Sequence, residues 1–201
     1  MQTTDTFNQK MVNYLGKIAT EGIHNAAKGF SGMLGQDLGV IDPEIKIIPL
    51  LDIAKVVGGP EDEVVGIYLR GTGQVETQFM LIIPYMRAME LVDLLMDQPA
   101  GTTTNLGSME RSALAEVGNL TATFFMNSVA ATTGITLYPT PPAVMVDMVG
   151  AILDIIIATT GGLSDFVLML NSKFVLNDRA VEADFWVIPD EQTLKLLATR
   201  I

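Results

Sequence analysis

The order of expected elements repeats along this chain, and that repetition constrains the fold more than any other feature of the sequence. Two glycine stop signals, Gly35 and Gly134, stand 99 residues apart, and two prolines, Pro43 and Pro142, stand at the same separation. Each glycine follows a long amphipathic segment, and each proline precedes a β-rich run. Landmarks that keep their order and spacing indicate an internal duplication. The alternative is a chance agreement among glycines and prolines.

The duplication predicts one domain, residues 1–201, built from two halves at about 8–97 and 108–201. A broken polar linker, residues 98–106, separates the halves. Each half is too thin to cover its own sheet, so we expect the two to pack together about a pseudo-twofold axis. The predicted fold class is α+β, each half having a long helix, antiparallel strands and a second helix.

The expected elements follow hydrophobic periodicity and turn signals. Helices are expected at 8–34, 85–97, 108–133 and 191–201, and strands at 45–50, 63–70, 75–83, 143–146, 166–176 and 180–188. Gly71-Thr72-Gly73 is expected to form the turn of a hairpin, with glycine supplying the special backbone angles. Residues 144–160 read as a core segment, because two aspartates interrupt their apolar run.

Charge and composition exclude several functions. Twelve basic against 23 acidic residues give a net charge of −11, which disfavours nucleic-acid binding. The absence of cysteine and the single histidine, His24, leave no thiolate or histidine-rich metal site in this chain. Its 49% of hydrophobic residues indicates a globular protein. Without a signal-peptide pattern or a membrane span, we expect a cytoplasmic protein that is not membrane-embedded.

A polar stripe runs along the second long helix. Ser112, Glu116, Asn119, Thr123 and Asn127 recur at helical spacing and fall within an arc of roughly 80°. Such a stripe is ordinarily the solvated face of a helix.

A glycine inside the same helix, Gly118, costs about 1 kcal/mol relative to alanine. It either lets another backbone approach beside Glu116 and Asn119, or it allows tight packing on the sheet. The sequence leaves both interpretations open.

Part of this stripe belongs to a longer motif. Ser112, Glu116 and Asn119 are followed, after twenty-two intervening residues, by Pro142. Requiring a proline at one fixed distance makes a chance match about twentyfold rarer, since proline is about 5% of residues. The motif resembles the signature of the CheC/CheX/FliY family of response-regulator phosphatases, and all four positions match it.

This resemblance implies a CheC-like fold and a chemotaxis enzyme that hydrolyses the aspartyl phosphate of the response regulator CheY. Asn119 would position the attacking water, and Glu116 would pair with a lysine of the receiver. Ser112 would orient Glu116, and Pro142 would shape the connection at the helix end. No cofactor is expected in this chain, because the receiver's own acidic pocket supplies Mg²⁺.

The first half matches the family signature only in part. Counting back 99 residues from Ser112, Glu116 and Asn119 gives Asn13, Lys17 and Thr20, while Pro43 matches Pro142. Lys17 reverses the charge of the expected carboxylate, and Thr20 lacks an amide. The resemblance therefore implies one working site, in the second half, and a degenerate first site at Lys17, Thr20 and Pro43.

Two alternatives come from a non-enzymatic class. A scaffold like the middle domain of the switch protein FliM would bind without hydrolysing, and would be expected to lack the glutamate and asparagine. A regulator of the deamidase CheD, another partner implied by the resemblance, would retain little phosphatase activity. The presence of Glu116 and Asn119 favours the phosphatase.

Overall fold

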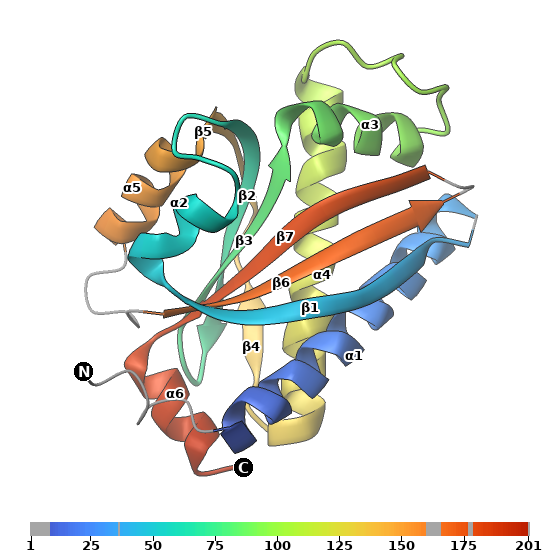
Figure 1. Cartoon of the computed structure of the whole chain (residues 1–201). Coiled ribbons are helices and arrows are strands. Elements are labelled where there is room, and N and C mark those ends of the chain that lie inside the picture. The colour runs from blue at the N-terminus through green and yellow to red at the C-terminus, as the bar shows by residue number, and fades with distance from the viewer. Residues whose placement is uncertain (1–8, 36, 160–165, 177–178, 201) are drawn as a thin grey trace.

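The computed structural model describes residues 9–35, 37–159, 166–176 and 179–200, and in it one antiparallel sheet carries helices on both faces (Figure 1). The elements in chain order are α1 (Gln9–Leu34), β1 (Gly39–Pro49), a 3₁₀ turn η1 (Leu50–Asp52), α2 (Ile53–Val56), β2 (Glu63–Gly73), β3 (Thr77–Pro84), α3 (Tyr85–Leu95), α4 (Ser108–Thr133), β4 (Leu137–Pro139), β5 (Ala143–Met148), α5 (Val149–Thr159), β6 (Phe166–Leu176), β7 (Arg179–Pro189) and α6 (Glu191–Ala198). The predicted α+β class is confirmed.

The strand order of the sheet is symmetric. It runs β1-β6-β7-β3-β2-β4, and β5 pairs with another part of β2. If β1 is exchanged with β5, β2 with β6 and β3 with β7, every strand between β1 and β5 keeps an equivalent pair of neighbours, and the same path is read in reverse. At its centre β3 pairs with β7, from Thr77 opposite Pro189 to Ile82 opposite Asp184. Two tandem halves would give this arrangement, and we propose the repeat at 8–97 and 108–201 on that basis.

Alternation along the strands divides the interior into two cores. In β2, Val65 and Ile67 face the larger core under α1, α3 and α4, whereas Val64 faces the smaller one under α2 and α5. Figure 1 shows α1 and α4 together on one face of the sheet and α2 and α5 on the other. The rings of Phe79 and Phe185 stack at a centroid distance of 5.8 Å within the larger core.

Helices α1 and α4 pack directly against each other. A β-carbon at Gly22 would lie 3.0 Å from Cα of Phe125, and Gly29 contacts the ring of Phe124. Near the other end, the Tyr14 hydroxyl donates to the Thr132 carbonyl at 3.3 Å. Rising residue numbers on α1 therefore meet falling numbers on α4, so the two helices run antiparallel.

Several boundaries differ from the sequence prediction. Gly71-Thr72-Gly73 is strand rather than turn, because these residues pair with Pro139, Tyr138 and Leu137 of β4. Strand β1 begins at Gly39 instead of residue 45, since pairing with β6 extends over the earlier residues. The core segment at 144–160 is the end of β5 followed by helix α5. Elements η1, α2 and β4 were not predicted.

The linker before α4 is fixed by a buried carboxylate, that of Asp93 on α3. Its Oδ2 accepts the backbone N–H of Gly101 at 2.7 Å and of Thr102 at 3.2 Å, and its Oδ1 accepts that of Thr103 at 2.7 Å. Burial alone would raise the pKa of Asp93, but the hydrogen bonds from the three linker residues outweigh it, and the pKa lies below its ordinary value.

Candidate functional site

The predicted catalytic pair lies on the outward face of α4. The helix starts after Gly107 and ends before Gly134, whose φ of 75° gives the left-handed cap that glycine adopts readily. Its inner face buries Leu114, Val117 and Phe125 in the larger core. Opposite that face, Glu116 is exposed and Asn119 is half-buried. The same packing that fixes the helix therefore turns the pair toward solvent.

Glu116 and Asn119 are not engaged by the chain itself. Within the described residues, neither side chain makes a hydrogen bond or an ion pair. Three residues apart on a helix, their β-carbons lie about 5–6 Å from each other. A carboxylate and a carboxamide thus stand side by side, with their bonding capacity free for a visiting molecule.

Gly118 serves packing on the sheet rather than access beside the pair. A β-carbon on this residue would overlap Cγ2 of Ile67 on β2. Of the two interpretations that the sequence left open, the structure supports tight packing.

Ser112 is exposed on the same stripe, but its hydroxyl bonds within the helix. Its Oγ donates to the carbonyl of Ser108 at 2.8 Å. Among the described residues no hydrogen bond joins Ser112 to Glu116, so the geometry does not show the orienting role that was expected.

Pro142 precedes β5, in a connection that is tied to β2. Thr140 donates its backbone N–H to the Arg70 carbonyl at 2.8 Å, and its Oγ1 accepts the Arg70 N–H at 2.9 Å. Two residues after Pro142, Val144 pairs with Ile67, the residue that contacts Gly118. Pro142 therefore lies close to the strand position that supports the middle of α4.

The residues of the predicted degenerate site lie apart from this pair. On α1, Lys17 is exposed and Thr20 is half-buried. Because α1 and α4 run antiparallel, Lys17 lies toward the C-terminal end of α4, away from Glu116. Pro43 belongs to β1, and its side chain is outside the described part of the chain.

Lys28, which no sequence motif singled out, is exposed on α1. It makes no ion pair with any residue that the structure describes. The available signal was compositional, since the expected first helix holds three lysines and one glutamate in a chain of net charge −11.

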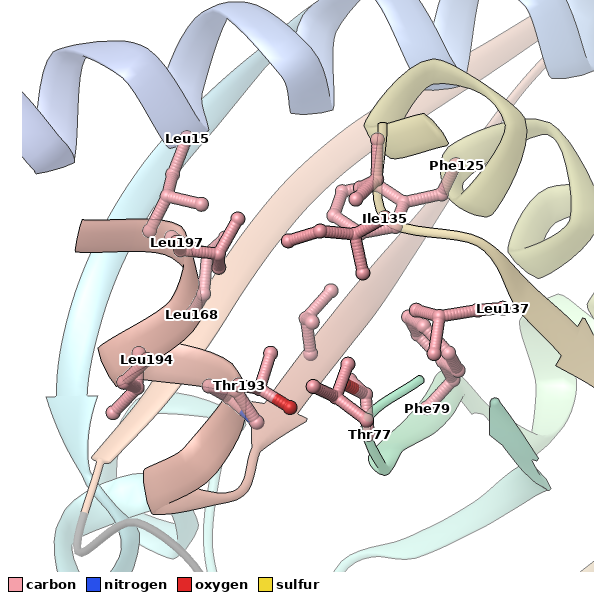
Figure 2. Close-up of a pocket in the computed structure, with 14 residues that line it drawn as sticks. Leu15, Thr77, Phe79, Phe125, Ile135, Leu137, Leu168, Thr193, Leu194 and Leu197 are labelled. Carbon is pink, nitrogen blue, oxygen red and sulfur yellow. The ribbon is translucent and has the colours of Figure 1, made fainter. Parts of the chain in front are cut away.

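Glu116 and Asn119 line neither of two hollows that the described residues form. An apolar cavity of about 30 Å³ lies beneath α6, lined by Leu15, Phe79, Leu197 and others (Figure 2). A wider groove of about 430 Å³ lies beside α3 and includes Met86 and Glu90. Small-molecule sites are ordinarily concave and enclosing. An exposed helix face suits a macromolecular partner better.

No three acidic or histidine side chains among them come close enough together to hold a metal ion. None of their helices is both long enough and apolar enough to cross a membrane.

Comparison with known proteins shows what the chain is similar to. Residues 109–146, which contain the whole motif, match the model of the CheC-like family. The chain is 22% identical over 201 residues to the CheY-P phosphatase CheC of Bacillus subtilis (strain 168), covering 98% of this chain and 96% of that protein.

Solved structures show the same fold. Thermotoga maritima FliY is similar with a TM-score of 0.75 and 18% identity, over 96% of each chain. The FliM middle domain from H. pylori is similar with a TM-score of 0.70 and 8% identity, over 97% of this chain and 100% of that one. The expected CheC-like fold is confirmed.

Proposed function

We propose that the chain is a CheC-type protein that dephosphorylates a CheY-type response regulator, because residues 109–146 match the CheC-like family and 98% of the chain is similar to the B. subtilis phosphatase. The single active site would comprise Glu116 and Asn119. The observation that carries this proposal is the presentation of both side chains outward from α4, unengaged by described residues, within the segment that matches the family.

Asn119 is suited to position the hydrolytic water. A carboxamide both donates and accepts hydrogen bonds, so it can hold a water in line with the breaking P–O bond. It is also neutral and adds no repulsion against the phosphoryl oxygens. The water oxygen bonds to phosphorus, the bond to the aspartyl oxygen breaks, and the water's proton leaves with inorganic phosphate while the receiver's carboxylate is restored.

Glu116 is suited to anchor the partner. Its carboxylate, exposed one helical turn from Asn119, can pair with a lysine of the receiver and so fix the amide over the phosphoryl group. It would not act as a proton acceptor, because a second carboxylate next to the phosphoryl charge is repelled. Mg²⁺ would be held by the receiver's carboxylates, and this chain would contribute no metal ligand.

Supporting roles remain for Pro142, which would fix the connection beside α4, and for Ser112, which would lie at the rim of the contact. Lys17, Thr20 and Pro43 would form no second catalytic site. We expect the protein to act in the cytoplasm, where chemotaxis receivers are found, and CheD to be a further partner.

Turnover of a phosphorylated receiver tests the proposal. Phosphate release from a CheY-type receiver charged with a small phosphodonor should accelerate with wild-type protein, and Asn119→Ala should reduce kcat roughly a hundredfold. Thr20→Ala on α1 serves as the matched control and should leave the rate unchanged.

The non-enzymatic alternative makes a different prediction. The fold similarity to the FliM middle domain is compatible with a protein that binds without catalysis. If wild-type protein binds the phosphorylated receiver and does not accelerate phosphate release, the binding function replaces the enzymatic one.

A further inference from the structure

Two lysines on α1 stand out because they have no acidic partner. Lys17 and Lys28 are exposed and form no ion pair within the described residues. Each of the other lysines with a described side chain pairs with a nearby acid: Lys46, Lys55, Lys173 and Lys195. Among the lysine side chains that the structure describes, the two without an acidic partner therefore lie on one helix.

The two lysines share one line along that helix. They are eleven residues apart, which is slightly more than three full turns at 3.6 residues per turn. Glu21, the single acid in α1, lies between them and is also exposed, yet it pairs with neither. With three lysines against one glutamate, α1 is positive in a chain of net charge −11.

The Lys28 end of this positive line lies nearer to the candidate site than the Lys17 end does. Gly29, the neighbour of Lys28, contacts the ring of Phe124 on α4. Asn119 precedes Phe124 by five residues, a rise of about 7.5 Å along the helix. Both helices lie on the same face of the sheet (Figure 1), so a protein seated on the outward side of α4 can extend across to α1.

We propose that Lys17 and Lys28 form an electrostatic docking stripe for the acidic surface of the phosphorylated receiver. This inference rests on the proposed function. The phosphoryl group and the carboxylates that hold Mg²⁺ make the receiver's pocket anionic, and a chain of net charge −11 would repel it. Unpaired ammonium groups on the neighbouring helix α1 offset that repulsion locally and orient the encounter. In this arrangement, the first half contributes binding where it has lost catalysis.

A pair of charge-reversal variants tests the stripe. Lys17→Glu/Lys28→Glu is compared with Lys55→Glu/Lys195→Glu, which changes the net charge equally on other elements and at exposed lysines. At low ionic strength the stripe variant should lose about tenfold in kcat/KM, through KM, with kcat at saturating receiver unchanged. At about 0.5 M salt the loss should shrink to less than about threefold, because exposed charges are screened.

Binding of a receiver loaded with trifluoroberyllate, a phosphoryl mimic, gives a readout that does not depend on turnover. Its Kd should rise about tenfold for the stripe variant and less than about twofold for the control. Equal losses of binding affinity in both double variants, or no loss in either, would overturn the docking stripe. In that case, an active wild type together with a slow Asn119→Ala would still support the phosphatase function. If only the stripe variant bound the receiver more weakly and Asn119→Ala kept full activity, the docking stripe would be supported and the proposed active site would be wrong.

Discussion

Gly118 of α4 lies so close to Ile67 of β2 that no β-carbon fits between them. Both residues are buried, and Ile67 pairs in turn with Val144 of β5. The helix that presents Glu116 and Asn119 is therefore seated directly on a strand at the level of those residues. A site that must hold a water in line benefits from such rigid support.

Gly118→Ala should destabilise the protein although alanine is the better helix former. The gain of about 1 kcal/mol in helix propensity is outweighed by overpacking against Ile67, which typically costs about 1–3 kcal/mol. Gly32 on α1 is the matched control, because a β-carbon there meets nothing within 4 Å. In urea unfolding, Gly118→Ala should lower the free energy of unfolding and Gly32→Ala should raise it. If Gly118→Ala were instead more stable than wild type, α4 would be able to move off the sheet.

Asp93→Asn should destabilise the linker that leads into α4. The asparagine cannot accept with both side-chain positions, so at least one N–H among Gly101, Thr102 and Thr103 loses its partner, at a cost of about 1–3 kcal/mol. The pKa of Asp93 is lower in the folded protein than in the unfolded chain. The carboxylate therefore contributes fully to the free energy of unfolding above the unfolded-state pKa, and this contribution is lost as the pH falls through the folded-state pKa. Unfolding measured across acidic pH should show the difference between wild type and variant narrowing toward low pH.

Asp184→Asn should have the opposite effect. Burial raises the pKa of Asp184, with a contribution from nearby Glu182, against the opposing hydrogen bond from Asn171 and the charge of Lys46. Since the folded protein holds the proton to higher pH than the unfolded chain, the free energy of unfolding falls as the pH rises from the unfolded-state pKa to the folded-state pKa. In the wild type, Asn171 Nδ2–H donates to the Asp184 carboxylate at 2.7 Å. The amide of the variant keeps an oxygen that can accept this hydrogen bond, and it carries no charge that burial would penalise.

The variant should therefore be more stable than wild type at neutral pH, with the difference vanishing at acidic pH. Asp154→Asn, at an exposed position on α5, is the control and should leave stability unchanged. A loss of stability in Asp184→Asn at neutral pH would show that the charged form of this carboxylate supports the fold.

Sequence patterns located the long elements well because those elements are amphipathic over many residues. The bounds of α4 and β6 coincide with the predicted ones. The outward placement of Glu116 and Asn119 also followed from helical spacing, since the apolar residues of α4 occupy the other side. Periodicity is a local property, and these features are local.

The features that were missed depend on contacts between distant residues. Gly71-Thr72-Gly73 looks like a turn until β4, more than sixty residues later, pairs with it. Helix α5 was read only as an apolar segment, because its hydrophobicity does not identify it as helix or strand. The unpaired state of Lys17 and Lys28 cannot be read from sequence, because ion pairs such as that of Lys173 with Glu182 form across strands.

Leu197→Ala should test how firmly α6 closes the core. Leu197 is buried and lines the apolar cavity of about 30 Å³ beneath that helix (Figure 2). Truncation adds to a void that already exists, so the cost should fall in the upper part of the usual range of about 2–5 kcal/mol. Lys195→Ala, exposed on the same helix, should change stability by less than about 0.5 kcal/mol. A cost below about 1 kcal/mol for Leu197→Ala would mean that α6 is only loosely docked.

Thr77→Val should stabilise the protein, whereas Thr193→Val, at the same cavity, should destabilise it. Both threonines are buried. The Thr77 hydroxyl has no hydrogen-bond partner among the described residues, so its removal relieves an unpaired polar group and should gain about 1 kcal/mol. The Thr193 hydroxyl donates to the Glu76 carbonyl at 2.9 Å, and its removal should cost about 1 kcal/mol. Valine has nearly the same shape as threonine, so urea unfolding of the two variants measures what each hydroxyl group contributes to the free energy of unfolding. A destabilised Thr77→Val would reveal a hydrogen-bond partner for the Thr77 hydroxyl, such as a bound water.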